Sequence, residues 1–458
     1  MCRQRLFATP LIFLRRRHEA AFHRQGIHWY CDPRNCLAGA PMTKTLKCDV
    51  LVIGTGIIGS MAALYLQNAG RDVVLLERGD VARGASSGNA GILAFSEIIP
   101  IPAPGIMKKA PRWLFDPLGP LSVPPAYASK IAPWLWRFWR ASAERNFRHG
   151  LKALTDINRL ASVEMAHVAA MPELSHLISK TGTLDLYDSE ASLEASRIDW
   201  DEKERAGFTF QRVGRREIEE LQPGLAPQFG HAVFSPDGLQ VSDPYDFTRA
   251  IFDLVIARGA SLRKGEAERI DAVGESTIVT LENGDKIDAD KVIVACGAWS
   301  RKLAASLGNV VPLETERGYN TTLPANAFNL TRQLYFNDHG FVVTPLANGI
   351  RVGGAVELGG LELPANFRRS EAMLKKAGRF LPGLRLEGGT QWMGFRPSMP
   401  DCLPVIGTAR ATPSVIYAFG HGHLGLTQSA ATARLVTQLV NAEDTTISVD
   451  PFRAGRFS

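Results

Sequence analysis

The hydrophobic pattern of residues 50–77 predicts a strand, a helix and a second strand in immediate succession. Val50–Ile53 is an unbroken apolar run, which is typical of a strand buried on both faces. No charge occurs from Val50 to Gly70, so a membrane-spanning helix is an alternative, but glycines near its start do not suit one. A second strand is expected at Asp72–Leu76, so we predict a βαβ unit.

Periodicity along the rest of the chain predicts alternating helices and strands. Helices are expected at 151–180, at Arg216–Leu221, from a cap at Asp243 to about Arg258, and at the end of 415–440. Strands are expected at Thr181–Asp188, on both sides of an Asn283-Gly284 turn, at 291–295, at Phe341–Leu346 and at Ile350–Leu358. Residues 98–125 are rich in proline and are expected to be irregular.

An aromatic stripe at helical spacing predicts a further helix near residue 135. The stripe comprises Ile131, Trp134, Leu135, Phe138 and Trp139, with Arg137 and Arg140 beside it. The favoured interpretation is a helix that packs this stripe on the core. The alternative is a basic aromatic surface that rests on a membrane.

Three glycines turn the first βαβ unit into a dinucleotide-binding fingerprint. Gly54, Gly56 and Gly59 follow the first strand as G-x-G-x-x-G, allowing a tight turn, close approach of a pyrophosphate and close packing of the helix. The phosphates are expected at the helix N-terminus. Glu77 ends the second strand, where an acid bonds a ribose hydroxyl and disfavours a phosphorylated ribose.

Composition and charge exclude nucleic-acid binding as the main function. The 458 residues have 45% hydrophobic and 21% charged content, which is typical of a globular protein of two domains. The net charge of +6 comes mostly from residues 1–41, which contain seven arginines, no lysine and two acids. This leader resembles a transit peptide, but a start at Met42 is the favoured interpretation.

The six cysteines indicate neither a metal site nor a disulfide framework. Three lie in the leader, and Cys48, Cys296 and Cys402 are scattered through the rest of the chain. This usage favours a reducing compartment, so we expect a cytoplasmic protein, with peripheral contact at the inner face of the cytoplasmic membrane as an alternative.

Five motifs in a fixed order resemble those of the D-amino-acid oxidase-like (DAO) family of FAD-dependent oxidoreductases, and most closely its bacterial D-amino-acid dehydrogenase branch. They are GTGIIG, SSGNAG, VIVACGAWS, GFRPSMPD and GHGHLG, and the resemblance runs from Lys47 to about Pro451. It implies an α/β fold in which a Rossmann-like FAD-binding domain holds an inserted α+β substrate domain built on a mostly antiparallel sheet.

The resemblance implies a discontinuous division of the chain. The FAD-binding domain would comprise 46–97, 150–180, 240–311 and 390–451. The substrate domain would comprise 98–149, 181–239 and 312–389. The last helix is expected to open at Gly422–Leu426, with its positive end toward the flavin.

The cofactor implied is FAD. Some relatives attach the flavin through a cysteine where this chain has Gly394, so non-covalent binding is expected. The implied cofactor-binding residues are Gly54, Gly56, Ile57, Gly59, Glu77, Arg78, Ser86, Ser87, Asn89, Ala90, Gly91, Gly297, Ala298, Trp299, Gly420, Gly422, His423, Leu424, Gly425 and Leu426.

Three residues are expected at the reacting end of the site. Arg396 matches the family arginine that grips the substrate carboxylate, and a planar guanidinium can hold it through two parallel hydrogen bonds. Tyr319 would line the substrate cavity. His421, if protonated, would offset charge on the reduced flavin. Their alternatives are a structural ion pair for Arg396, packing for Tyr319, and a turn histidine bonded to backbone for His421.

The function implied is oxidative deamination of D-amino acids to 2-oxo acids and ammonia, by hydride transfer from the α-carbon to flavin N5, in amino-acid catabolism. Alternatives on the same scaffold are oxidation of D-proline or hydroxy-D-proline, and of sarcosine or glycine. A non-catalytic subunit that relays electrons is a third alternative. No second G-x-G-x-x-G occurs, so the electron acceptor is expected to be a quinone, a flavoprotein or oxygen.

Overall fold

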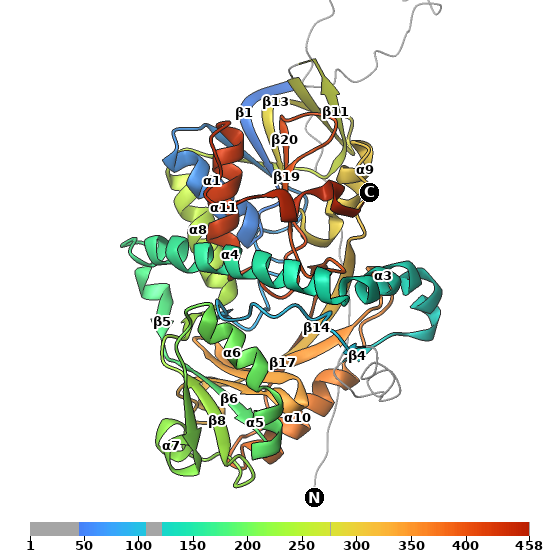
Figure 1. The fold of residues 1–458 in the computed structure, drawn as a ribbon. Helices are drawn as coiled ribbons and strands as arrows, with labels where there is room; N and C mark the ends of the chain where they lie inside the picture. The colour runs from blue at the N-terminus through green and yellow to red at the C-terminus, as the bar shows by residue number, and fades with distance from the viewer. Residues whose placement is uncertain (1–44, 107–120, 275, 458) are drawn as a thin grey trace, which may run out of the picture. The chain divides into compact units, whose positions relative to one another are not determined.

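A computed structural model describes residues 45–106, 121–274 and 276–457, which all belong to one compact unit, Thr43–Ser458 (Figure 1). The predicted leader 1–41 and the start at Met42 lie outside the described residues, as do 107–120 within the predicted irregular segment.

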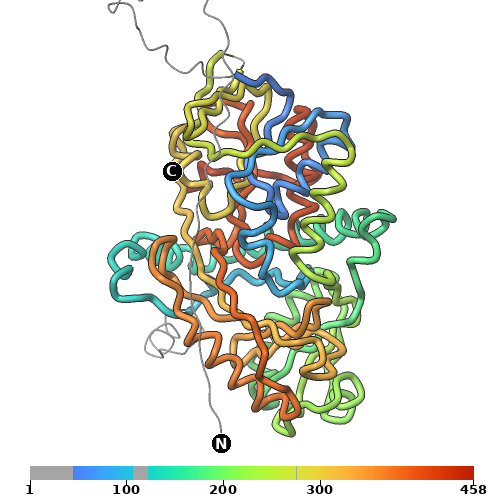
Figure 2. The backbone as a smooth tube through the Cα atoms, turned by 180° about the vertical axis from the view of Figure 1, so that it is seen from behind, coloured from blue at the N-terminus to red at the C-terminus, as the bar shows by residue number. Residues whose placement is uncertain are grey.

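The first sheet, sheet A, is built around the predicted βαβ unit. Strands β1 (Thr45–Ile53) and β2 (Val73–Glu77) are parallel neighbours joined by helix α1 (Ile57–Asn68), as predicted. The order of the main path is β10 (Ser261–Lys264), β2, β1, β13 (Lys286–Val294), β12 (Ser276–Leu281) and β11 (Ala267–Val273). Strand β20 (Val415–Phe419) pairs in parallel with β13, and β19 (Val405–Thr408) pairs with β20. Strands far apart in sequence therefore lie together (Figure 2).

Both faces of sheet A are buried, which explains the continuous apolar run of β1. Val50 and Val52 pack into a core shared with helices α1, α8 (Pro244–Ala257) and α11 (Ser429–Val440). Leu51 and Ile53 point the other way, into a second core with helix α9 (Ser300–Ser306). Successive side chains of a strand face opposite sides, so a strand covered on both sides needs apolar residues at every position.

The second sheet, sheet C, is mostly antiparallel, as expected. Its main path runs β18 (Thr390–Ser398), β14 (Glu314–Leu323), β17 (Gly349–Glu357), β16 (Phe341–Leu346), β15 (Gln333–Phe336), β6 (Thr183–Tyr187), β8 (His231–Ser235) and β7 (Gln211–Gly214). The pairs β15–β6 and β17–β4 (Leu121–Ser122) are parallel. Helix α10 (Arg368–Phe380) packs its buried residues into the core of this sheet. The predicted fold class is confirmed.

Several predicted bounds are wrong. The helix expected at 151–180 is α4 (Glu144–Ala169), and residues 178–180 form strand β5, which pairs with β9 (Leu239–Val241) in a small sheet with β3 (Ile92–Leu93). Helices α5 (Glu190–Ala195) and α6 (Arg197–Arg205) were not predicted. Residues 390–398 pair with β14 of sheet C, although the predicted division grouped them with the FAD-binding segments.

The aromatic helix is α3 (Ala128–Ala141), and only part of its stripe is buried. Ile131 and Trp134 are buried beside Leu358, and the Trp134 ring stacks on Phe138 at 5.4 Å. Trp139 is 51% exposed, so its predicted place in the packed stripe is wrong. No helix within the described ranges is long and apolar enough to cross a membrane.

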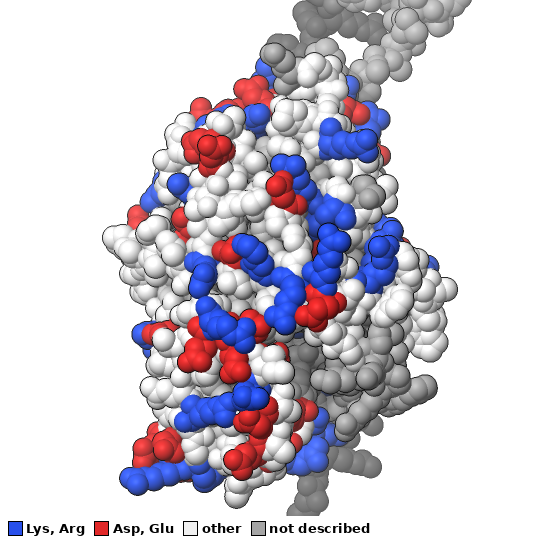
Figure 3. All heavy atoms as spheres, viewed as in Figure 1, with Lys and Arg blue, Asp and Glu red and all other residues white. Residues whose placement is uncertain are grey.

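Charge on the molecular surface is mixed. Over the face seen in Figure 3, acidic and basic side chains are interspersed. Elsewhere in the described chain, opposite charges also pair one helical turn apart, such as Arg215 with Glu219 and Arg249 with Asp253. This face therefore does not carry the continuous basic surface that nucleic acids require.

The predicted cap of α8 is confirmed and gives a stability prediction. Asp243 accepts hydrogen bonds from the backbone N–H groups of Tyr245 and Asp246, at 2.8 and 3.1 Å, and from Asn348 Nδ2 at 2.7 Å. Its carboxylate also lies 3.7 Å from the buried Arg351. We expect Asp243→Ala to lower the free energy of unfolding by about 2 to 4 kcal/mol, measured by denaturant titration. The matched variant Asp253→Ala removes an exposed acid of the same helix, and equal losses in both variants would contradict this role.

Candidate active site

A cavity of about 790 Å³ lies where the carboxyl ends of β1 and β2 approach strands β14, β17 and β18. Most of the predicted cofactor residues line it, and they come from four of the five sequence motifs and from the end of β2. Four of them do not line it: Gly59, Ser87, Gly91 and Gly420. The cavity therefore joins the fingerprint region of sheet A to the face of sheet C that carries Arg396.

The fingerprint glycines create close backbone approaches. Gly54 has a φ of +104°, and a Cβ atom there would lie 2.5 Å from the carbonyl oxygen of Ala295. A Cβ atom on Gly59 would lie 1.9 Å from the carbonyl oxygen of Gly54. Gly59 thus packs α1 against the turn rather than facing the cavity, which agrees with the packing role expected of the third glycine.

Glu77, the acidic residue at the end of β2, lines the cavity. Glu77 accepts hydrogen bonds from Thr55 N at 3.0 Å, Thr55 Oγ1 at 2.8 Å and Gly79 N at 2.9 Å. Next to it, Arg78 lies over the Trp299 ring, with Cζ 4.3 Å from the ring centroid. This contact joins two predicted cofactor residues that are far apart in the sequence, and Trp299 in turn meets Phe395 edge-on at 5.6 Å.

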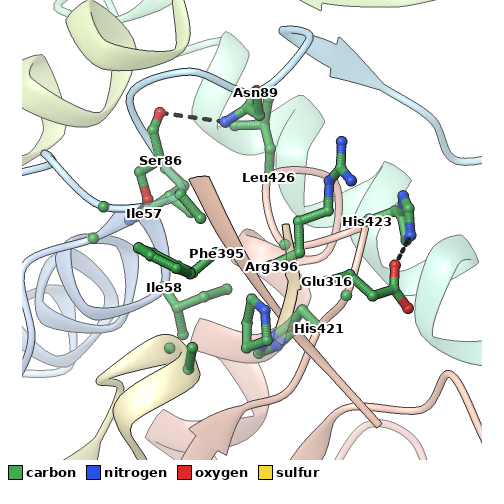
Figure 4. A pocket seen from close by; sticks show the side chains of 18 of the residues that line it. Ile57, Ile58, Ser86, Asn89, Glu316, Phe395, Arg396, His421, His423 and Leu426 are labelled. Carbon is green, nitrogen blue, oxygen red and sulfur yellow. Dashed lines mark hydrogen bonds and ion pairs between the residues drawn. The ribbon is translucent and has the colours of Figure 1, made fainter. Parts of the chain in front are cut away.

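The loop at 86–91 is fastened to the start of α1. Ser86 Oγ accepts the backbone N–H of Ile57 at 2.9 Å, and Asn89 bonds both Ser86 O and Gly91 N (Figure 4). Arg351 Nη1 donates to Asn89 O at 2.5 Å, which holds the loop from sheet C. Ser87 turns away and donates to Gly84 O. The loop is therefore fixed along one wall of the cavity.

These elements fit a dinucleotide. Helix α1 begins without a side-chain cap and with no acid in its first turn, so its positive end favours an anion. A Cβ atom on Gly56 would approach Ser86 Oγ to 3.1 Å, so the glycine leaves room at the helix start. Gly54, Gly56 and Glu77 would hold the adenosine diphosphate part of FAD.

The substrate end is built on two neighbouring strands. Arg396 of β18 lies directly across from Glu316 of β14, so their side chains share one face of sheet C. A Cβ atom on Gly318 would lie 2.4 Å from Arg396 Cζ, so a larger residue there would push the guanidinium out of its present position. Burial lowers the pKa of Arg396, and the charge of Glu316 partly offsets this effect.

Glu316 is a site residue that the sequence analysis missed. It is 8% exposed and lines the cavity. Its Oε2 atom lies 2.5 Å from His423 Nε2 (Figure 4). The available signal was the pair Glu316-Arg317 within a strand that is otherwise buried, because buried charges need partners. Arg317 instead forms an ion pair with Glu357 at 3.3 Å, and both of these side chains are buried.

The predicted charge on His421 is wrong. Burial lowers the pKa of His421 to about 3, so the ring is neutral near pH 7, and its Nε2 lies 2.9 Å from Thr432 Oγ1. The last helix also begins later than expected, because α11 starts at Ser429. Residues Gly422–Leu426 form a turn along the cavity wall instead of opening the helix.

Tyr319 lies on the opposite side of β14 from Glu316 and Gly318, because neighbouring strand residues alternate between faces. Although Tyr319 is among the cavity-lining residues, its hydroxyl accepts Asn366 N at 3.0 Å and donates to Glu357 at 3.2 Å. The structure therefore does not bring its side chain together with Arg396.

This placement predicts a structural effect for Tyr319→Phe. We expect kcat/KM to stay within about threefold of wild type, while the free energy of unfolding falls by roughly 1 to 2 kcal/mol, because the buried Glu357 and the backbone N–H of Asn366 each lose a partner. Steady-state kinetics and denaturant titration would test both. A fall in kcat of about 100-fold without loss of stability would instead place the hydroxyl in the reaction.

Comparison with known proteins identifies relatives along nearly the whole described chain. Residues 49–439 match the family model described as FAD dependent oxidoreductase (DAO). The chain is 33% identical over 421 residues to a D-amino-acid oxidase of Bradyrhizobium diazoefficiens, covering 89% of this chain and 98% of the relative. It is 30% identical over 417 residues to a D-amino acid dehydrogenase of Neisseria meningitidis, covering 89% and 99%.

Solved structures share the fold. Glycine oxidase from Geobacillus kaustophilus superposes with a TM-score of 0.70 at 20% sequence identity, covering 90% of this chain and 99% of that one. L-proline dehydrogenase from P. horikoshii gives a TM-score of 0.67 at 17% identity, covering 90% and 98%. Both support the two-sheet architecture.

Proposed function

Because the chain belongs to the FAD dependent oxidoreductase (DAO) family, we propose that it oxidises D-amino acids to 2-oxo acids and ammonia as a dehydrogenase. The observation that carries this proposal is the position of Arg396, a half-buried cation in the same cavity as the dinucleotide-binding elements. The two curated relatives described above, a D-amino-acid oxidase and a D-amino acid dehydrogenase, support the same substrate class.

The residues of the chain bind and orient the substrate. FAD, when bound, supplies the hydride acceptor. The guanidinium of Arg396 can grip a carboxylate through two parallel hydrogen bonds, which fixes the direction of the α-carbon. We infer that the shape of the remaining cavity wall then decides which enantiomer can place its side chain without a clash.

Non-covalent binding of the flavin is supported by the state of the nearby thiols. Cys296 and Cys402 line the cavity. Burial raises the pKa of Cys296 to about 12 and also raises that of Cys402. A protonated thiol is a poor nucleophile, so neither cysteine is suited to form a bond to the flavin.

Anaerobic reduction tests the function. Purified protein with bound FAD, mixed with D-alanine without oxygen, should lose its flavin absorbance, whereas L-alanine should leave it unchanged. Repeating the measurement with D-proline and sarcosine ranks the cyclic and secondary amines that the scaffold also suits. A flavin that stays oxidised with every D-amino acid would favour an electron-relay subunit and would overturn the proposal.

The electron acceptor is measured in the same preparation. As a dehydrogenase, the protein should reduce a quinone analogue faster than it produces hydrogen peroxide in air. Faster peroxide formation would make it an oxidase of the same substrates.

A further inference from the structure

Two opposite charges face the cavity without neutralising each other. Glu316 and Arg396 are directly paired across β14 and β18, and both line the cavity. Among the described residues, however, no ion pair within 4.0 Å joins them. The guanidinium and the carboxylate are thus neighbouring, separate groups on one wall (Figure 4).

Glu316 is held ionised by its surroundings. Its charged neighbours are His423 from the turn after β20 and Arg396 from β18, and the thiol of Cys402 lies near it. Burial alone would raise the pKa of Glu316, but the charge and hydrogen bond of His423, together with Arg396, lower it below its ordinary value. The wall therefore presents a stable anion beside a stable cation.

We propose that Glu316 is the binding site for the substrate's amino group, and that His423 positions it. This inference rests on the proposed function. An amino acid carries its carboxylate and its ammonium on one carbon, so it needs an anion and a cation side by side. With the carboxylate on Arg396, the ammonium reaches Glu316.

The proposal makes Glu316 a determinant of specificity. A carboxylate that lacks an amine brings a negative charge next to the buried Glu316 and offers it no cation, and this repulsion weakens binding. The site therefore discriminates amino acids from 2-hydroxy acids and simple carboxylates. His423 does not touch the substrate in this arrangement.

The test uses two ligands that differ only in the amine. α-Aminoisobutyrate has no α-hydrogen and cannot be oxidised, and isobutyrate is its amine-free equivalent. We expect Glu316→Gln in the FAD-loaded protein to raise the Kd of α-aminoisobutyrate by about 10- to 100-fold. The change in flavin absorbance on titration with the ligand measures this Kd. Isobutyrate should bind as well as before or more tightly, because an anion has been removed beside its site.

Each outcome is decisive. Equal weakening of both ligands would assign Glu316 a merely structural role, and unchanged binding of α-aminoisobutyrate would exclude it as the amino-group site. The control is Glu314→Gln, which removes an acid of the same strand that bonds Tyr127 outside the cavity lining and should leave both Kd values unchanged.

A second variant tests the positioning role and does not depend on the first. In His423→Asn, Glu316 loses the imidazole that lowers its pKa, so its pKa should rise and the carboxylate should become protonated at higher pH than in wild type. As the pH is lowered, the variant should therefore lose affinity for α-aminoisobutyrate at a higher pH than wild type does. Its affinity for isobutyrate should show no such shift. An unchanged pH profile would overturn this role.

The D-alanine reduction assay on wild type separates failure of the proposed function from failure of the amino-group site.

Discussion

Replacing Arg396 with alanine is expected to lower kcat/KM for D-amino acids by about 10²- to 10³-fold while FAD stays bound. Arg396 is the cation through which the cavity grips a carboxylate, and its loss also leaves Glu316 without its cross-strand counter-charge. Steady-state kinetics with D-alanine would measure the loss, and the flavin spectrum after gel filtration would report cofactor retention.

Two further variants sharpen this prediction. Arg396→Lys keeps the charge but lacks the planar fork, so it should recover only part of the activity. Arg216→Ala removes an exposed arginine paired with Glu220 on helix α7 (Arg215–Leu221) and should behave as wild type. Wild-type kinetics in Arg396→Ala would show that the carboxylate is bound elsewhere.

The second large effect is expected at Gly59. A Cβ atom there would lie 1.9 Å from the carbonyl oxygen of Gly54, and because that atom is backbone, α1 must move away from the turn. We expect Gly59→Ala to destabilise the protein by about 3 kcal/mol and to lose bound flavin. Thermal unfolding and flavin content per protein would measure both.

The matched control for this prediction is Gly230→Ala. Gly230 has no neighbour within 4 Å of its built Cβ position, so an alanine there should change neither stability nor flavin content. If Gly59→Ala kept wild-type stability and cofactor, the close approach would not govern the geometry of the fingerprint.

Local patterns predicted what depends on neighbouring residues in sequence. The run Val50–Ile53, the cap at Asp243 and the turn at Asn283-Gly284 all form as expected, because strand burial, N-capping and tight turns need only a few adjacent residues. The position of Arg396 on the cavity wall was implied by a motif of eight residues.

What escaped prediction depends on the register between strands and on burial. Glu316 and Arg396 are about 80 residues apart in the chain, and only the pairing of β14 with β18 makes them neighbours. Tyr319 lines the cavity as expected, but the alternation of side chains along β14 places its side chain on the other face of the strand from Arg396. His421 is neutral because of its burial, and a short motif contains no information on burial.

Arg351 links the N-cap of helix α8 to the loop that is expected to lie beside the flavin. It lies between the α8 cap, through Asp243, and the 86–91 loop, through Asn89. A ligand that binds only the native state raises its population by mass action. Cells short of riboflavin should therefore accumulate less of this protein, since the unliganded form is more often open to proteolysis.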